Sequence, residues 1–178
     1  KDNPNYMFDN EDGILYRIIN EDSRELIAFF PGMSYDMKSE LEPLTINLQD
    51  SVKIIRDNAF FWIQLYGWGE SEINIPSNSK LEKIGTGSLS YATIKFEGTF
   101  PSTLKYIESS AFVGSTIRGI TSADFLPSGL IELGRSEDSP FSECSFITNT
   151  DYSFDTITIP SSLEFIAESC FDDFSISN

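Results

Sequence analysis

One spaced apolar pattern recurs five times along the chain and constrains its fold more than any other feature of the sequence. In each copy an apolar lead residue is followed three positions later by Ile or Leu, and then by a small residue and a large apolar one. Four copies have similar gaps, and the fourth of the five has a longer one. The copies are Val52, Ile55, Ala59 and Phe60; Leu81, Ile84, Ser88 and Leu89; Leu104, Ile107, Ala111 and Phe112; Leu130, Leu133, Pro140 and Phe141; Leu163, Ile166, Cys170 and Phe171. One such unit cannot bury its own apolar side chains, so the repeat predicts stacked coils that share one continuous core.

A second signature lies just before each lead residue. A proline precedes the lead by three positions at Pro101, Pro127 and Pro160 and by five at Pro76, and Gln49 takes its place in the first unit. Because proline has no N–H to donate to a sheet, it is expected to end a strand and begin a turn.

Three segments upstream of these turns, 46–48, 73–75 and 157–159, alternate apolar, polar and apolar residues. Such alternation is typical of a short half-buried strand, and strands of neighbouring coils are expected to pair in parallel about 4.8 Å apart. The sequence therefore predicts a leucine-rich-repeat solenoid, mostly β, with short parallel strands stacked coil on coil and little helix. We expect a parallel sheet on one face and irregular turns on the other. A β-sandwich with coincidental spacing is the alternative, and the joint recurrence of two signatures favours the solenoid.

The chain is predicted to form a single domain over residues 1–178. Residues 46–178 contain about five repeats, whereas residues 1–45 show a different pattern of apolar and polar residues. Two apolar runs, Ile14 to Ile18 and Leu26 to Phe30, flank polar residues, which predicts a β-hairpin-like unit with a long polar loop. This N-terminal unit is expected to cap or continue the array as a variant repeat, and the C-terminal residues are expected to form a last strand.

Charge and composition exclude several classes of function. The chain has 28 acidic and 12 basic residues, a net charge of −16, so its surface repels phosphate backbones and no nucleic-acid partner is expected. It has no histidine, which excludes the usual Ser–His–Asp and Cys–His machinery and His-ligated metals. No apolar run approaches about 18–20 residues, so no membrane-spanning segment is expected. We expect no cofactor, and a monomer is favoured although the oligomeric state stays open.

These signatures resemble the BspA-like leucine-rich repeat, whose unit runs strand, Ile-Pro, apolar lead, Ile, Ala-Phe and often a following Cys. Residues 159–171 match nearly the whole unit, 141–144 match its end, and 3–32 fit a variant unit. Gln49, Gly98 and Asp124 depart from the pattern. The resemblance implies a bacterial or protozoan protein at the cell surface or outside the cell. It also implies a role in adhesion, in which the chain binds a host or matrix protein or a glycan. Since the sequence begins at Lys1, any signal or anchor is expected outside it.

The first candidate binding site is the aromatic insertion between the first and second units. Trp62, Tyr66 and Trp68 carry the side chains that dominate protein interfaces and stack on sugar rings. The competing interpretation is that Phe60, Ile63 and Leu65 belong to the repeat core and that the other residues of the insertion pack over the stack.

The second candidate site is a polar row on the sheet. Residues between inward-facing aliphatics of a strand point to its opposite face, which places Asn47, Asn74 and Thr158 on the sheet surface. Lys95 or Thr99 joins them, depending on the register. The open sheet face of a solenoid is a common binding surface, and the competing interpretation is a merely solvated face.

The cysteines and acidic pairs indicate no chemistry of their own. Cys170 takes the small core position and Cys144 another, so two buried thiols are expected rather than a disulfide. Acidic pairs such as Asp172 with Asp173 lack the spacing of a calcium loop and are interpreted as solubilising charge.

The sequence thus favours a non-catalytic surface module that binds protein or glycan. The alternative is a structural spacer that presents other domains of a longer surface protein. A carboxylate-pair hydrolase is a third hypothesis, and it requires two facing carboxyl groups about 5–9 Å apart.

Overall fold

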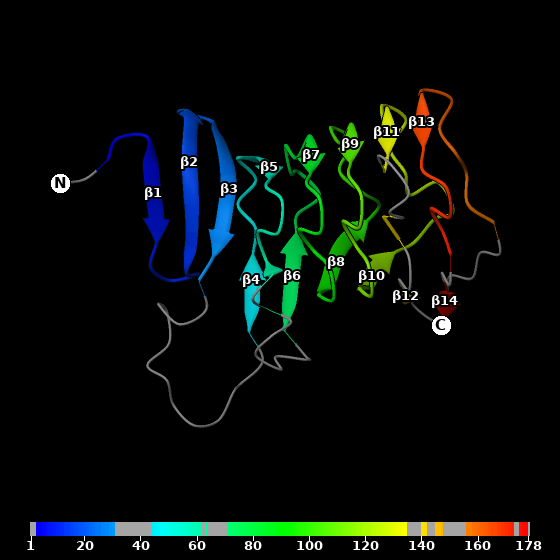
Figure 1. Cartoon of the computed structure of the whole chain (residues 1–178), viewed down its shortest axis with the longest axis horizontal. Coiled ribbons are helices and arrows are strands. Elements are labelled where there is room, and N and C mark those ends of the chain that lie inside the picture. The colour runs from blue at the N-terminus through cyan, green and yellow to red at the C-terminus, as the bar shows by residue number, and fades with distance from the viewer. Residues whose placement is uncertain are drawn as a thin grey trace.

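A computed structural model describes residues 3–30, 44–61, 63, 71–134, 140–141, 145–147, 156–172 and 175–177. Within these ranges fourteen strands form two sheets, and Phe61 and Ile63 are helical. The chain runs as an elongated stack of coils from the N-terminus at one end to the C-terminus at the other (Figure 1). The predicted mostly-β solenoid is confirmed.

Eight strands form the first sheet, in the order β1-β2-β3-β5-β7-β9-β11-β13. Their bounds are β1 Tyr6–Asp9, β2 Ile14–Asn20, β3 Ser23–Phe29, β5 Val52–Ile55, β7 Lys83–Ile84, β9 Tyr106–Ile107, β11 Glu132–Leu133 and β13 Phe165–Ile166. The strands from β3 onward pair in parallel.

Six strands form the second sheet, in the order β14-β12-β10-β8-β6-β4, all in parallel. Their bounds are β4 Thr45–Asn47, β6 Glu72–Ile75, β8 Thr93–Gly98, β10 Thr116–Ile120, β12 Ser145–Ile147 and β14 Ser175–Ser177. Figure 1 shows that each coil contributes a strand to this sheet and then one to the eight-stranded sheet. The expectation of irregular turns on one face is therefore wrong, because the short strands around the Ile three after each lead also pair.

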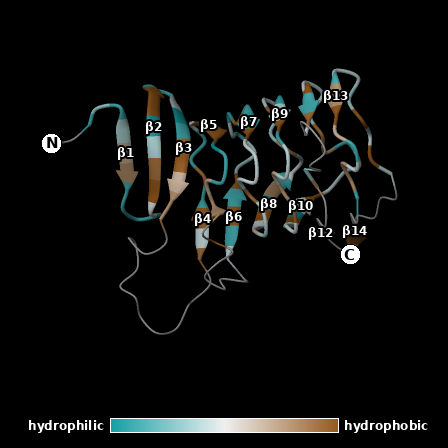
Figure 2. Ribbon diagram, viewed as in Figure 1, coloured by the Kyte–Doolittle hydropathy of each residue, from teal (hydrophilic) through white to brown (hydrophobic). Residues whose placement is uncertain are grey.

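The core lies between the two sheets and is built from repeated rows. Ile55, Ile84, Ile107 and Leu133 are in register on successive strands of the eight-stranded sheet, and each is fully buried. Ile166 continues this row in the last coil, where it is 46% exposed. Hydrophobic residues are spread along the whole stack (Figure 2). Assigning the lead, Ile and small–large positions to the core was correct for the first four units.

The predicted proline turns are confirmed by their hydrogen bonds. The N–H of the lead Leu104 donates to the carbonyl of Pro101 at 3.0 Å, and the leads of the fourth and fifth units do the same. Gln49 stands in for proline as expected, since Val52 N–H donates to its carbonyl at 3.1 Å. The turn needs only a carbonyl acceptor at this position, which explains why glutamine is accepted there.

The small–large pairs form a further ladder of backbone hydrogen bonds. Phe60 N–H donates to the Ser88 carbonyl at 3.1 Å, and Leu89 N–H donates to the Ala111 carbonyl at 3.0 Å. Each large residue is thereby tied to the small residue of the next coil. The rings of Phe112 and Phe141 stack at 5.2 Å, so side chains also align from coil to coil.

Two insertions lie between a strand of the six-stranded sheet and the proline that follows it. β6 ends directly before Pro76, whereas β10 ends at Ile120, well before Pro127, and β12 ends at Ile147, well before Pro160. The strand predicted at 157–159 is therefore wrong, because residues 145–147 take its place in the sheet.

The N-terminal unit is a hairpin, but its loop is short. β2 and β3 pair antiparallel up to Asn20 and Ser23, so only Glu21 and Asp22 turn the chain. The predicted long polar loop is wrong because polar residues at the ends of both runs also pair. β1 adds a third antiparallel strand, and β3 joins β5 in parallel, so the unit continues the array. The expected last strand is present as β14.

Candidate functional site

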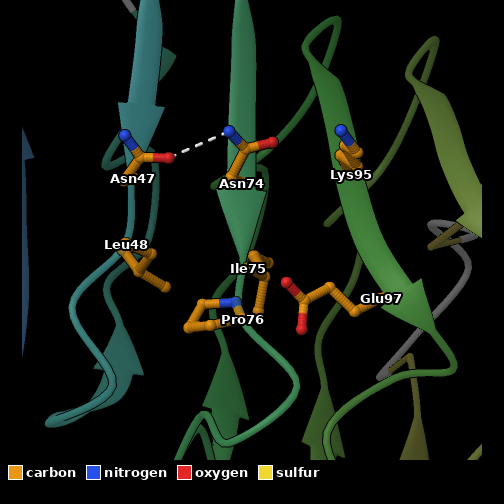
Figure 3. A pocket seen from close by; sticks show the side chains of 7 residues that line it. All are labelled: Asn47, Leu48, Asn74, Ile75, Pro76, Lys95 and Glu97. Atoms are coloured by element: carbon orange, nitrogen blue, oxygen red, sulfur yellow. Dashed lines mark hydrogen bonds between the residues drawn. The ribbon is translucent and has the colours of Figure 1, made fainter.

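Polar side chains form a row across the outer face of the six-stranded sheet. The parallel register aligns Asn47 of β4 with Asn74 of β6, Asn74 with Lys95 of β8, and Lys95 with Arg118 of β10. The isoleucine before each of them is buried, so the alternation of a strand turns all four outward. Figure 3 shows the first three on adjacent strands. These four residues are called the outer row below.

The amides of the two asparagines are joined. Nδ2 of Asn74 donates to Oδ1 of Asn47 at 2.9 Å (Figure 3). Oδ1 of Asn74 is buried and has no hydrogen-bond partner among the described residues. An unpaired buried acceptor costs about 1–3 kcal/mol, so a donor that reached this oxygen would be held favourably.

The two cations of the outer row share one carboxylate. Nζ of Lys95 lies 3.9 Å and a guanidinium nitrogen of Arg118 lies 3.8 Å from the oxygens of Glu72. More than half of each cationic side chain is exposed, against 21% of Glu72. Exposed pairs at such distances contribute at most about 1 kcal/mol each. Both cations are therefore held over the sheet and remain accessible to a partner.

A shallow pocket of about 200 Å³ opens beside the outer row, at the ends of β4, β6 and β8. Its polar members come from the strand faces, and its apolar members are the last residue of β6 and the residues directly after β4 and β6. The lining residues are Asn47, Leu48, Asn74, Ile75, Pro76, Lys95 and Glu97. Figure 3 shows Glu97 and Pro76 on one side of the pocket and the amides and Lys95 on the other.

Among the described residues that line the pocket, Glu97 is the acidic one. Its Oε2 accepts a hydrogen bond from the backbone N–H of Ser77 at 3.0 Å. Hydrogen bonding from the Ser77 side chain and backbone, with Lys95 nearby, lowers the pKa of the Glu97 carboxyl. The pocket therefore offers an ionised acceptor in a fixed position, opposite the ammonium donor.

The structure brings together part of the predicted polar row. Asn47 and Asn74 lie on the sheet face as expected, and Lys95 joins them rather than Thr99, which follows the end of β8. Thr158 was placed wrongly: it is exposed but belongs to no strand, and its N–H donates to the Ala123 carbonyl at 3.1 Å. The cause is the insertion before Pro160, which moves the strand of that unit upstream.

The aromatic candidates lie outside the described residues. This holds for Trp62, Tyr66 and Trp68, and their binding role stays a prediction. Of their neighbours, Phe60 and Ile63 are buried as expected, whereas Phe61 is 46% exposed.

Arg118, Glu72 and Glu97 were not singled out from the sequence, although a signal for Arg118 existed. A Thr-Ile pair precedes the outer-row residue at 45–47, 93–95 and 116–118, where the third residue is Asn47, Lys95 or Arg118. Aligning these triplets, rather than the segments next to proline, would have found the row. Glu97 had no comparable signal, because its place depends on a turn from another coil.

In the described ranges of the chain, no group of three or more Cys, Asp and Glu residues is placed to hold a metal ion. Cys170 is a buried free thiol, while Cys144 lies outside the described residues. None of the helices in those ranges has the length and apolar character to cross a bilayer.

Comparison with known proteins supports the repeat assignment. The family described as BspA type leucine rich repeat region matches residues 38–148 and 142–178, in six copies. No curated protein and no solved structure gives a significant match to the chain.

Proposed function

Because the chain belongs to the BspA-type leucine-rich repeat family, we propose that it is a non-catalytic binding module of the cell surface or extracellular space. In this proposal it contributes to adhesion by recognising a protein or a glycan, and the outer row of the six-stranded sheet makes the contact. Repeat proteins of this family are often surface-associated and take part in binding, which supports the general role.

The observation that carries the proposal is the register of the outer row. Four side chains with hydrogen-bonding groups are held on neighbouring strands about 4.8 Å apart, above a continuous buried core. A partner that meets such a surface does not have to order it, so less free energy is lost on binding. The exposed cations Lys95 and Arg118 are suited to hydrogen bonds with carbonyl, carboxylate or hydroxyl oxygens.

The test compares charge reversals on the two sheets. The chain is immobilised and its binding to host cells, purified matrix proteins and glycans is measured by surface plasmon resonance. The variant with Lys95→Glu and Arg118→Glu is expected to lose at least about tenfold in affinity, which is about 1.4 kcal/mol. The matched control reverses Lys53 and Lys83, whose side chains pair with Glu82 and Glu108 beside the eight-stranded sheet.

Equal binding by the two double variants would contradict a contact through the outer row. If the unaltered chain binds none of these partners while the full-length protein still mediates adhesion, the spacer hypothesis is favoured instead. Thermal unfolding of each variant is recorded first, so that loss of binding is not confused with loss of fold.

A further inference from the structure

The pocket beside the outer row combines a donor, an acceptor and a small apolar surface. Lys95 supplies the ammonium donor, Glu97 the carboxylate acceptor, and Pro76 a partly buried ring. Leu48 and Ile75 also line it, but they are only 3% and 1% exposed, so they offer a ligand little apolar area. A ligand must therefore gain most of its affinity from hydrogen bonds.

The two charged groups stand in a fixed relation to each other. Lys95 and Glu97 are two positions apart on β8, on the same outer face of the strand. Two strand residues span roughly 6.6 Å along the strand, so the charges lie too far apart to cancel directly. The backbone N–H of Ser77, in the turn after β6, donates a hydrogen bond of 3.0 Å to the Glu97 carboxylate. Glu97 is therefore positioned before a ligand arrives.

These features select the chemistry of the ligand. It must offer an acceptor to Lys95 and a donor to Glu97 across that distance, and it must carry no net charge that either group would repel. A hydroxyl group donates and accepts, and a ring that carries several hydroxyls meets both demands with one rigid body. An acidic ligand would face Glu97 and a chain whose net charge is −16. A peptide side chain finds no apolar hole to fill.

We propose that this pocket binds a neutral, hydroxyl-rich sugar unit of a glycan, with hydroxyls held by Lys95, Glu97 and the amide of Asn47, and one ring face against Pro76. This rests on the proposed binding function and narrows its partner to carbohydrate at this place. Nδ2 of Asn47 is available for such a contact, because the Asn47 amide uses Oδ1 to accept from Asn74.

The experiment is saturation-transfer-difference NMR followed by titration. The probes are neutral oligosaccharides of glucose, galactose and mannose, and the comparison arm is a set of oligosaccharides that end in sialic acid. At least one neutral set is expected to bind and the acidic set is expected to bind more weakly. Glu97→Gln and Lys95→Met are each expected to weaken binding about tenfold, the effect of losing a charged hydrogen bond. Gln keeps an oxygen for Ser77 N–H, so the turn stays in place.

The controls are Lys105→Met and Glu164→Gln, which alter exposed residues outside the pocket and are expected to bind like the unaltered chain. The proposal would be overturned if no neutral probe bound or if the pocket variants bound sugar as tightly as the unaltered chain. It would also be overturned if the acidic set bound more tightly than the neutral sets. If one variant unfolds, the other decides. If the unaltered chain bound a protein partner but no sugar, and the Lys95 and Arg118 double variant lost the protein partner, the proposed function would stand. Only the assignment of a sugar to this pocket would then be wrong.

Discussion

Three polar residues in the turns of the solenoid adopt a backbone conformation that ordinarily belongs to glycine. Asn58, Ser110 and Ser169 have φ of 55°, 56° and 53°, and each directly precedes the small residue of its unit. Gly87 holds the same place in the second unit, with φ 60°. The left-handed turn is thus a property of the repeat, and it aims the small residue inward and its carbonyl toward the preceding coil.

Replacing Ser110 with glycine is expected to stabilise the chain. The change removes about 1–2 kcal/mol of backbone strain and loses about 0.5–1 kcal/mol to the greater freedom of glycine in the unfolded state. The free energy of unfolding should rise by about 0.5–1 kcal/mol, seen as a higher urea midpoint at unchanged slope. Ser102→Gly is the control, because Ser102 is exposed in a turn without a left-handed φ. A lower midpoint for Ser110→Gly would contradict the strain argument.

Cys170 fills the small position of the last unit, and burial raises the pKa of its thiol to about 12. In the unfolded chain a thiol titrates near pH 8.5, so as the pH rises the unfolded state loses its proton first. The unfolded state then binds fewer protons than the folded one, and stability falls from about pH 8.5 toward 12.

The prediction uses a Cys144→Ser background, in which Cys170 is the only thiol. At pH 8 a disulfide reagent should label the folded chain at least about tenfold more slowly than the chain in urea, because thiolate is scarce and shielded. Adding Cys170→Ala should reduce the loss of stability above pH 8.5. Fast labelling of the folded chain, or the same alkaline loss in both variants, would show that the thiol is not buried as described.

At the scale of the element, β8 and β10 meet at a bulge formed by glycine. Gly119 has φ 81°, and a Cβ there would lie 2.0 Å from the carbonyl oxygen of Phe96. The register between the two strands shifts just after Arg118, and Gly98 pairs with Ile120 beyond the shift. The bulge lets both strands end their pairing where the insertion before Pro127 begins.

Gly119→Ala is expected to cost about 2–4 kcal/mol, since a wrong φ and a backbone clash act together. Gly98→Ala is the matched control: its φ is 94°, but the nearest atom to a new Cβ is Thr121 Oγ1 at 3.4 Å. Strain alone should make this change cost about 1–2 kcal/mol. Urea unfolding measures both, and a Gly98 variant at least as unstable as the Gly119 variant would refute the clash.

A strand or turn can be predicted from the sequence when residues close to it along the chain determine it. Strands 45–47 and 72–75 and the turns at Pro101 and Gln49 follow from nearby residues, so they were predicted within about one residue. The two-residue strands such as Lys83–Ile84 were missed, because so short a segment has no periodicity. Their pairing comes from the stacking of coils.

The candidate site was only partly predictable for the same reason. Asn47 and Asn74 alternate with buried isoleucines within one strand, which sequence reveals. Glu72 reaches Arg118 across β8, and Glu97 meets a turn twenty residues earlier in the chain. Such contacts depend on register between coils, and Thr158 shows that one insertion is enough to shift it.

At the scale of the whole molecule, the solenoid continues one packing pattern from coil to coil. The rings of Phe112, Phe141 and Phe171 stack in succession, at 5.2 Å and 5.4 Å with nearly parallel planes. Each coil of such a stack packs only against its neighbours, whereas the repulsion between like charges acts at long range among all the coils.

That charge supplies the last prediction. With a net charge of −16 the folded chain repels itself, and ion pairs such as those of Lys95 and Arg118 with Glu72 offset little, because both cationic side chains are more than half exposed. Raising NaCl from 0.01 M to 0.15 M shortens the screening length from about 30 Å to about 8 Å. The melting temperature at pH 7 should rise by about 2–4 °C, as for a gain of about 1 kcal/mol. KCl should act alike, and a fall in melting temperature with both salts would mean that ion pairs outweigh repulsion.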